Sequence, residues 1–230
     1  MEAKKIYLDY AATTPVDPEV VEAMIQCLGP DGDYANSSSS HFFGKSAKVH
    51  IDTARGQIAA RIGAEVDSIC FTSGATESDN MALIGTMNAN QHRGRHLITS
   101  TLEHKAVLDT AYALKDQGFE ITFVDHDEHG VISTQQLATA IRNDTVLVSI
   151  MHVNNETGVL QDLAALGELC QERGVLFHVD AAQSVGKVPL NVADFSVDLV
   201  SLTAHKAYGP MGIGALYIRK GMKIAPMIYG

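Results

Sequence analysis

From about residue 68 onward, short runs rich in β-branched residues alternate with longer stretches of helical spacing. Seven runs have the character of strands: 68–72, 96–100, 120–124, 146–150, 175–179, 197–202 and 213–218. Apolar residues at three- and four-residue spacing predict helices at 77–91, 104–117, 134–142 and 162–173, and an earlier helix at 46–62. Alternating strands and helices build a mainly parallel sheet covered on both faces. We therefore predict an α/β fold, a three-layer sandwich around a seven-stranded, mainly parallel sheet.

Turn and cap signals refine this prediction. The last two strands are joined by a Gly/Pro turn too short for a parallel crossover, so we expect the final strand to be antiparallel. Gly118 and Gly174 stand where helix C-terminal caps belong, and "STQQ" at 133–136 is typical of a capping box. The first 45 residues are rich in loop-forming types, and "NSSSSHFFG" at 36–44 is the most polar piece.

Composition excludes several classes of protein. The 230 residues carry a formal net charge of −10 with no cluster of Lys and Arg, which disfavours nucleic-acid binding. Apolar runs such as "TVLVSIM" fall far short of the ~20 residues a bilayer span needs, and the N-terminus lacks a secretory h-region. We expect a cytoplasmic protein. Three widely spaced cysteines without C-x-x-C argue against disulfides and a zinc site, and each is interpreted as a small apolar residue: Cys27, Cys70 and Cys170.

Polar residues gather just past the predicted strands. The stretches "SGATES", "TLEHK", "MHVNNETG", "DAAQS" and "TAHK" each follow one strand. Ligands of open α/β sheets bind at the carboxyl edge of the strands, where these stretches would meet. The residues that we expect along this edge are Gly74, Ala75, Thr76, His104, Asn155, Asp180, Gln183, His205 and Lys206.

Two of these stretches favour an anionic and a cationic ligand group. In "TSGATESDN", small residues before a helix that starts at Thr76 would present free N–H groups to a phosphate; the alternative is a plain cap paired with Asp79. Asp180 follows a strand that reads as buried, where a carboxylate requires a partner. That partner is either a cationic ring nitrogen or a structural donor at a helix cap.

The other polar residues have equally plain alternatives. An imidazole at His104 could stack on a flat ligand or transfer a proton, or could simply begin a helix. Gln183 and Asn155 could bind a ligand oxygen or stabilise turns. His41 is interpreted as a surface residue unless its loop folds over the site.

Lys206 connects these features into one chemistry. In a sheltered site a lysine amine can form a Schiff base with an aldehyde; the alternative is a solvated lysine in a turn. A Schiff-base lysine, an aspartate for a pyridinium nitrogen and a helix N-terminus for a phosphate are what pyridoxal phosphate needs. The sequence therefore predicts this cofactor and no metal.

Six segments together resemble the cysteine desulfurases of the iron–sulfur cluster assembly type: "YLDYAATTPVDPEV", "FTSGATESDN", "TLEHKAVLDT", "SIMHVNNETGV", "FHVDAAQSVGKVP" and "TAHKAYGPMGIGALY". These are class V aminotransferase-like enzymes of fold-type I. The resemblance implies a homodimer that uses pyridoxal phosphate to convert L-cysteine to L-alanine. Sulfur then passes as a persulfide to a scaffold protein or to tRNA-thiolation partners.

The resemblance also implies individual roles. Lys206 would bind the cofactor covalently, and His104 would stack over its ring and assist proton transfer. Asp180 would hold the pyridine nitrogen, Gln183 the phenolic oxygen, and Asn155 would lie beside substrate and cofactor. The phosphate would be bound by Ala75, Thr76, Thr203 and His205.

The sequence departs from the family pattern in three places. Ala204 stands where the family has Gly, and the loop 36–41 lacks the family's proline. The chain also ends before the family's C-terminal part, which holds the substrate-binding arginine and the nucleophilic cysteine. We expect residues 1–15 to be a segment that packs with an absent small domain and 16–230 to be the cofactor-binding large domain. The alternatives are a selenocysteine lyase or another class V enzyme, and an inactive binding or dimerisation module.

Overall fold

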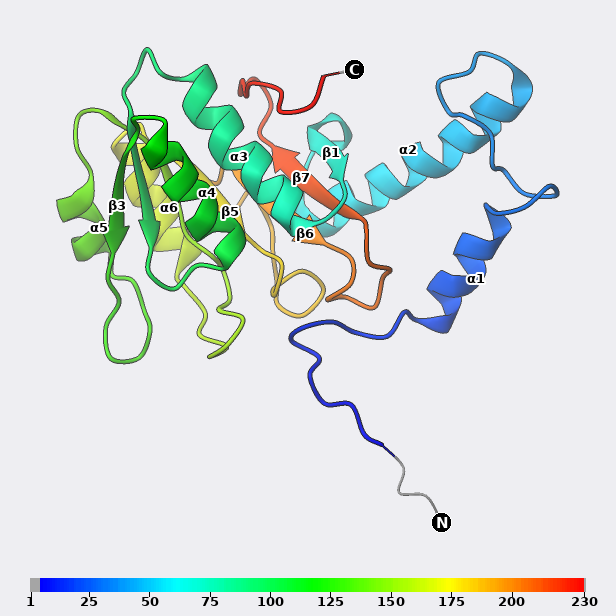
Figure 1. Ribbon diagram of the computed structural model, residues 1–230, viewed down its shortest axis with the longest axis horizontal. Coiled ribbons are helices and arrows are strands. Elements are labelled where there is room, and N and C mark those ends of the chain that lie inside the picture. Colours follow the sequence, from blue (N-terminus) through cyan, green and yellow to red (C-terminus); the bar gives the residue numbers. More distant parts are fainter. Residues whose placement is uncertain (1–4, 230) are drawn as a thin grey trace.

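The computed structural model describes residues 5–229 and contains one seven-stranded sheet (Figure 1). Its strand order is β1-β7-β6-β5-β4-β2-β3. The strands are β1 Ile69–Thr72, β2 His96–Ser100, β3 Glu120–Val124, β4 Thr145–Ser149, β5 Leu176–Asp180, β6 Leu199–Thr203 and β7 Gly214–Ile218. All seven predicted strands are present, with ends shifted by no more than two residues. The prediction of a mainly parallel α/β sheet is confirmed.

Strand β7 is antiparallel to both of its neighbours, β6 and β1. The prediction of an antiparallel final strand is therefore confirmed, and the structure adds that β7 lies inside the sheet rather than at its edge. Because β1 is antiparallel to β7, it runs in the same direction as the five parallel strands. Six carboxyl ends consequently point toward one edge of the sheet.

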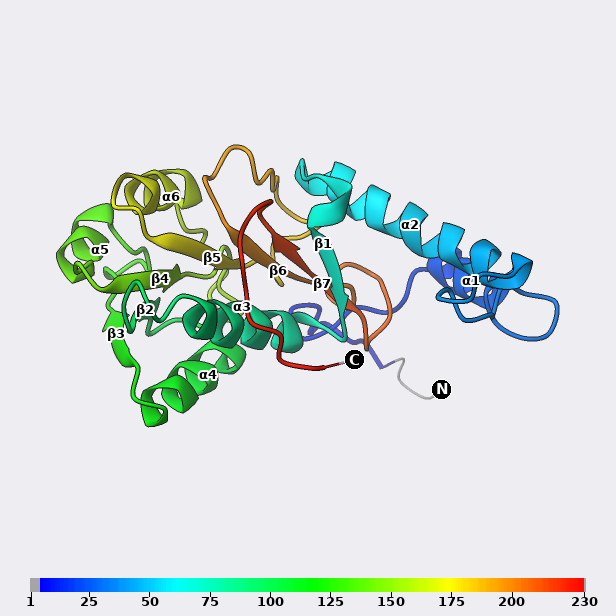
Figure 2. The ribbon, with the colours of Figure 1, turned by 90° about the horizontal axis from the view of Figure 1, so that it is seen from above.

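Helices cover both faces of the sheet (Figure 2). Helices α3 (Ala75–Ala89) and α4 (Lys105–Asp116) pack on one face, and α5 (Thr134–Ala140) and α6 (Leu163–Glu172) pack on the other. The C-terminal end of α2 (Phe42–Ile62) joins the second group, and a short 3₁₀ helix, Val66–Ser68, leads into β1. The three-layer prediction is confirmed. Among residues 5–229, no helix combines the length and apolarity needed to cross a bilayer.

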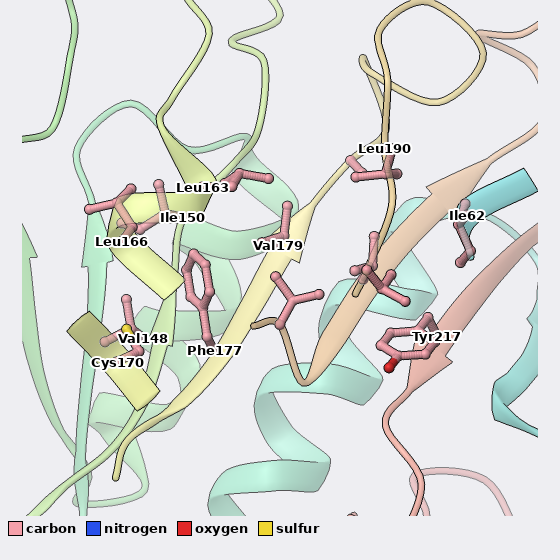
Figure 3. Packing of buried hydrophobic residues seen from close by; sticks show 14 of the residues in the cluster. Ile62, Val148, Ile150, Leu163, Leu166, Cys170, Phe177, Val179, Leu190 and Tyr217 are labelled. Carbon is pink, nitrogen blue, oxygen red and sulfur yellow. The ribbon is translucent and has the colours of Figure 1, made fainter. Parts of the chain in front are cut away.

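Neighbouring strand residues alternate between two apolar cores. On β4, Leu147 packs with the α3 and α4 side chains, whereas Val148 packs with those of α5 and α6. Figure 3 shows the second cluster, in which Phe177 lies among Leu166 and Cys170 of α6. Burial on both faces explains why the central strands are nearly continuous apolar runs. Each fully buried side chain of this size stabilises the fold by about 1.5–3 kcal/mol.

The local cap predictions agree with the structure. Ser133 and Gln136 form the reciprocal bonds of a capping box at the start of α5. Gly118 and Gly174 directly follow the cap residues of α4 and α6, with left-handed φ of 84° and 65°. These angles favour glycine because it has no Cβ to clash with the preceding turn.

The N-terminal region holds more helix than its composition predicts. Helix α1 (Pro18–Gln26) begins behind Asp17, whose side chain accepts the Glu19 N–H at 2.9 Å. Helix α2 begins at Phe42 rather than 46, because the Nδ1 of His41 accepts the Gly44 N–H and caps the helix. His41 is exposed, as predicted. Histidine is not among the usual capping residues, so its local pattern did not mark a helix start.

Helix α1 and the first half of α2 project from the sheet (Figure 1). The predicted apolar stripe of α2 is buried only at its end, where Ile62 enters the core, whereas Ile51 is 38% exposed. Large exposed apolar side chains are concentrated in this region: Val21, Met24, Ile25, Leu28, Tyr34, Phe42, Phe43 and Val49. Contiguous exposed apolar residues of this kind are typical of a surface that packs against another protein part.

Candidate active site

The carboxyl edge of the sheet carries a cavity of about 680 Å³. All ten residues predicted for this edge and its site line one cavity: Gly74, Ala75, Thr76, His104, Asn155, Asp180, Gln183, Thr203, His205 and Lys206. They come from the ends of β1, β2, β4, β5 and β6, which the parallel arrangement brings to the same edge. The structure thus brings every predicted residue together, while the role of each stays a prediction.

One corner of the cavity is formed by the start of α3. Gly74 caps this helix with φ 154° and ψ 178°, a conformation almost restricted to glycine. The first helical bond runs from the Ser78 N–H to the Gly74 carbonyl, so the preceding amides of 75–77 are open to an anion. Thr203 adds a buried hydroxyl without a hydrogen-bond partner. This corner has the donors that a phosphate group requires.

The alternative interpretation of this corner, a cap formed by Thr76 with Asp79, is wrong. Gly74 is the N-cap, no side chain caps the helix, and α3 begins at Ala75. Asp79 instead lies completely buried against the sheet. Glu77 does interact with this turn, because its carboxylate accepts the Ser73 N–H at 2.6 Å, and the hydroxyls of Thr72 and Ser78 donate to the Gly74 carbonyl at 3.2 Å.

Asp180 lies at the floor of the cavity as the last residue of β5. One of its oxygens, Oδ1, accepts the Ala182 N–H at 2.8 Å. Burial raises the pKa of the Asp180 carboxyl, and that backbone bond together with the charges of Lys206 and His104 opposes the increase. A cation bound beside Asp180 would add to these opposing effects, because an opposite charge favours the ionised carboxylate.

Lys206 lies in a tight turn directly after β6. The N–H groups of Ala207 and Gly209 both donate to the Ala204 carbonyl, at 2.9 and 3.0 Å. A Cβ on Gly209 would lie 2.7 Å from the Ala204 Cβ, so glycine is required at 209. Ala204 is not among the described residues with positive φ, so its departure from the family's glycine fits the turn without strain. Burial, followed by the charge of Lys206, lowers the pKa of His205 and favours its neutral form.

His104 is the N-cap of α4 and also lines the cavity. Its Nδ1 accepts the Ala106 N–H at 3.1 Å. This bond orients the ring and leaves the proton of the neutral imidazole on Nε2. Both of the predicted interpretations therefore apply to the position: His104 begins a helix and also presents its ring to the site.

The two predicted amides differ in their surroundings. The Nδ2 of Asn155 donates to the neighbouring Glu156 carboxylate at 2.6 Å. The turn itself is stabilised by the preceding residue, Asn154, whose Oδ1 accepts the N–H groups of Glu156 and Thr157. Gln183 uses one donor of its amide on the Ala11 carbonyl at 2.8 Å, which leaves its second N–H for a ligand.

Comparison with known proteins agrees with this arrangement. A family model described as aminotransferase class-V matches residues 6–230. The chain belongs to the aminotransferase class-V family. Cysteine desulfurase IscS from Proteus mirabilis is 58% identical to this class-V chain over 220 residues, which are 95% of the chain and 54% of that relative. Cysteine desulfurase IscS from Vibrio cholerae serotype O1 is 57% identical over the same length. The chain spans about half the length of these curated relatives.

Solved structures show the same fold. A structure described as SspA in complex with cysteine superimposes on the class-V chain with a TM-score of 0.95 at 42% identity. The match covers 98% of this chain and 65% of that structure. A NifS-like protein matches with a TM-score of 0.95 at 40% identity, over 99% of this chain and 62% of the other. The resemblance to cysteine desulfurases is therefore confirmed at the level of family and fold.

Sequence reasoning missed a buried polar layer behind the site of this class-V chain. Asp79 Oδ1 lies 3.6 Å from His178 Nε2, and both side chains are completely buried. The two ring nitrogens of His178 contact the hydroxyls of Ser149 and Ser201 at 2.8 and 3.0 Å. Burial, then the charge of Asp180, raises the pKa of Asp79 well above its usual value, and burial lowers the pKa of His178 to about 3. Burial thus favours the neutral form of both groups.

Glu103 is a further buried acid at this edge. Its Oε1 accepts the Ser100 hydroxyl at 2.7 Å and the Met151 N–H at 2.9 Å, and its Oε2 has no partner. Burial raises the pKa of Glu103 to about 8. At the sequence level, "TLEHK" directed attention to the histidine, and nothing in the local pattern identified the glutamate as buried.

The N-terminal segment was also missed as part of the site. Asp9, Ala11 and Ala12 line the cavity, and Thr13 and Thr14 bond to the turn that carries Lys206. The predicted packing of residues 1–15 with a small domain stays a prediction, and residues 1–4 lie outside the described part. The only available signal was "YLDYAATTP" itself, whose paired hydroxyls precede α1.

The cysteines do not line the cavity. Cys70 lies in β1, Cys170 in α6 and Cys27 just after α1, and all three are free thiols. Burial raises the pKa of Cys70, and it raises that of Cys170 to about 12. Thiols with raised pKa values are poor nucleophiles. Within residues 5–229, no three His, Cys, Asp or Glu side chains are grouped to hold a metal.

Proposed function

We propose that this chain binds pyridoxal phosphate and is the cofactor-binding part of a cysteine desulfurase. The observation that carries the proposal is the meeting of the α3 N-terminus, Asp180 and Lys206 in one cavity of about 680 Å³. Pyridoxal phosphate offers an anion, a basic ring nitrogen and an aldehyde, and each has a chemically suitable group in this cavity. Membership of the class-V family supports the same cofactor.

The phosphate corner fits the group closely. The Thr203 hydroxyl is buried and unpartnered, and such groups are costly unless a ligand or water satisfies them. Gly74 leaves open space: a Cβ added there would approach nothing nearer than the Thr203 Oγ1, at 3.9 Å. We propose that Thr203, His205 and the amides of Ala75 and Thr76 bind the phosphate.

When bound, the pyridinium ring of the cofactor withdraws electrons from the α-carbon of an amino acid. Asp180 would hold a negative charge at the ring nitrogen, which would keep that nitrogen protonated. His104 would stack over the ring and could move a proton through Nε2, since its Nδ1 accepts the Ala106 N–H. Lys206 anchors the cofactor through Nζ. The free N–H of Gln183 binds the phenolic oxygen, and Asn155 contacts cofactor and substrate.

We propose L-cysteine as the substrate. The IscS relatives are named cysteine desulfurases, and the SspA structure holds cysteine. In the net reaction, L-cysteine and an enzyme thiol give L-alanine and an enzyme persulfide. The C–S bond of the substrate breaks, an S–S bond to the enzyme thiol forms, and no external oxidant is required. None of Cys27, Cys70 and Cys170 is assigned as that thiol. The persulfide sulfur then passes to an iron–sulfur scaffold protein or to tRNA-thiolation partners.

Homodimerisation forms part of the proposal. The exposed apolar side chains on α1 and the first half of α2 offer a surface for a second copy, and the family resemblance implies a dimer. Sedimentation of the chain at several concentrations tests this point. A chain that stays monomeric at all of them contradicts the dimer.

Binding is tested by adding pyridoxal phosphate to the chain and following its absorbance. We expect the longer-wavelength band of the lysine-bound form, absent in Lys206→Ala and retained in Lys115→Ala, which removes an exposed lysine on α4. A band that survives Lys206→Ala contradicts the assignment of Lys206. A colourless chain that still binds a partner favours an inactive binding module.

Turnover is tested by incubating the loaded chain with L-cysteine and a reductant. Because no described cysteine lines the cavity, we expect no sulfide release from the 230 residues alone. Robust release shows that the sulfur acceptor has been misplaced. Release of alanine from selenocysteine but not from cysteine favours the selenocysteine lyase alternative.

A further inference from the structure

The N-terminal arm, defined here as residues 11–17, lies along the turn that carries Lys206. The Thr14 N–H donates to the His205 carbonyl at 2.8 Å, and the Asp17 N–H donates to the Tyr208 carbonyl at 2.9 Å. Backbone N–H groups of the arm therefore bond to carbonyl groups of the turn. Beside it, the Gln183 amide bonds the Ala11 carbonyl, so the arm also contacts the segment after β5.

The hydroxyl of Thr14 bonds to backbone groups on both sides of Lys206. Its O–H donates to the His205 carbonyl at 2.9 Å, and its Oγ1 accepts the Tyr208 N–H at 2.8 Å. A hydroxyl can donate once and accept twice, so both functions are in use. Thr14 is buried, which shields these bonds from competing water. The two bonded residues, 205 and 208, bracket Lys206.

The turn depends on such outside support. Tyr208 has a left-handed φ of 60°, a strained conformation for a residue with a side chain, and its N–H is paired through Thr14. Strained residues persist where surrounding contacts hold them in place. The described contacts that reach Tyr208 from the arm are the hydroxyl of Thr14 and the N–H of Asp17; the ring of Tyr10, directly before the arm, adds an edge-on contact.

We infer that Thr14 is a positioning residue for Lys206: its hydroxyl fixes the backbone on both sides of the lysine and so holds the amine at the cavity. This inference rests on the proposed function, because it takes Lys206 as the anchor of the cofactor. It assigns the N-terminal arm a part in cofactor attachment, although Thr14 itself does not line the cavity.

The test uses three variants of the 230-residue chain. Thr14→Val keeps the shape and removes the hydroxyl, Thr14→Ser restores a hydroxyl, and Thr13→Val removes the neighbouring hydroxyl, which bonds His205 but not Tyr208. The first measurement is backbone hydrogen exchange of residues 204–209 without cofactor. The second is the rate at which added pyridoxal phosphate becomes bound to Lys206, followed by absorbance.

We expect Thr14→Val to raise the exchange rate of the Tyr208 amide about tenfold and to slow attachment of the cofactor about tenfold, the effect of one lost hydrogen bond. Thr14→Ser returns both rates toward those of the unmodified chain, and Thr13→Val changes exchange at Tyr208 little. If Thr14→Val does not fold, Thr14→Cys replaces it, and its weaker donor should give intermediate rates.

Two results overturn the inference. Unchanged exchange at Tyr208 in a folded Thr14→Val shows that the hydroxyl does not hold the turn. Faster exchange with unchanged attachment shows that the turn is held without positioning Lys206. If the unmodified chain binds no pyridoxal phosphate, the proposed function fails and the inference fails with it, whereas exchange at Tyr208 still reports the hydroxyl's hold on the turn.

Discussion

The cavity has two kinds of wall. Its floor is made by strand ends: Asp180 closes β5, Thr203 closes β6, and both are buried. Its N-terminal side is made by the arm. In the residues that lead into the arm, the side chain of Leu8 is exposed and that of Tyr10 is half-exposed. The floor takes its geometry from the register of the sheet, whereas the arm takes its geometry from a few hydrogen bonds to one turn. The floor is consequently rigid by packing, and the arm is positioned by specific polar atoms.

The largest expected effect comes from the floor. Asp180→Asn keeps the side-chain shape and removes the charge, so bound pyridoxal phosphate loses its counter-ion in a buried setting. Breaking a buried pair costs about 3–5 kcal/mol, so cofactor affinity should fall at least about 100-fold. Equilibrium dialysis measures the affinity, and Asp194→Asn, at an exposed position, is the matched control. Equal affinity in both variants shows that Asp180 does not face the ring nitrogen.

The second effect tests how closely the floor is packed. A Cβ on Gly214 would lie 2.5 Å from the Leu202 carbonyl oxygen and 2.6 Å from the Gly74 Cα. Gly214→Ala should therefore lower the free energy of unfolding by about 1–3 kcal/mol and displace the phosphate corner. Gly56→Ala, in open space within α2, should instead stabilise the chain by about 0.5–1 kcal/mol. Denaturant melts of both variants measure the contrast; a fully stable Gly214→Ala contradicts the close packing.

The floor and the arm also differ in how far they could be predicted. Asp180 and Lys206 were placed correctly at one edge because strand periodicity and parallel topology determine where strand ends go. The partners of Thr14 could not be predicted, because they lie 191 and 194 residues away and no local pattern encodes that contact. The alternative of a cap paired with Asp79 rests on spacing alone, and only the packing of α3 on the sheet shows Asp79 to be buried.

The third effect is a pH dependence of stability that arises from the buried Glu103. Burial raises the pKa of Glu103 from 4.5 to about 8, so between these values the folded chain keeps a proton that the unfolded chain has lost. Stability should therefore fall as pH rises from about 4.5 to 8, and this contribution should level off above pH 8. Glu103→Gln removes the titrating group. The free energy of unfolding of this variant should therefore fall less steeply with pH than that of the unmodified chain, by up to about 1.4 kcal/mol per pH unit.

Chemical denaturation at pH 5, 6, 7 and 8 measures both slopes. Comparing slopes rather than absolute values separates the titration from any packing cost of the amide. Parallel slopes for the two chains show that Glu103 is ionised in the folded state at neutral pH.

The smallest effect belongs to Tyr10, which directly precedes the arm. The ring of Tyr10 meets that of Tyr208 edge-on, with centroids 6.5 Å apart, and Tyr10 is 44% exposed. Tyr10→Ala should lower the free energy of unfolding by only about 0.5 kcal/mol, a value at the low end of those for aromatic pairs. Tyr34→Ala, at a more exposed tyrosine, should change it less. If Tyr10→Ala lowers the free energy of unfolding as much as Gly214→Ala does, the N-terminal side of the cavity is as closely packed as the floor.

The place of β7 inside the sheet has a consequence for the order in which the molecule is assembled. Strand β1, which leads into the proposed phosphate corner, is an edge strand that pairs, among residues 5–229, with β7 alone. During synthesis on the ribosome, residues 69–72 emerge long before residues 214–218, and until then β1 has no partner in the sheet. Pairings this distant in sequence form late, because the closure of a long loop must precede them. The corner at the start of α3 is thus translated well before β7, the strand that completes its surroundings.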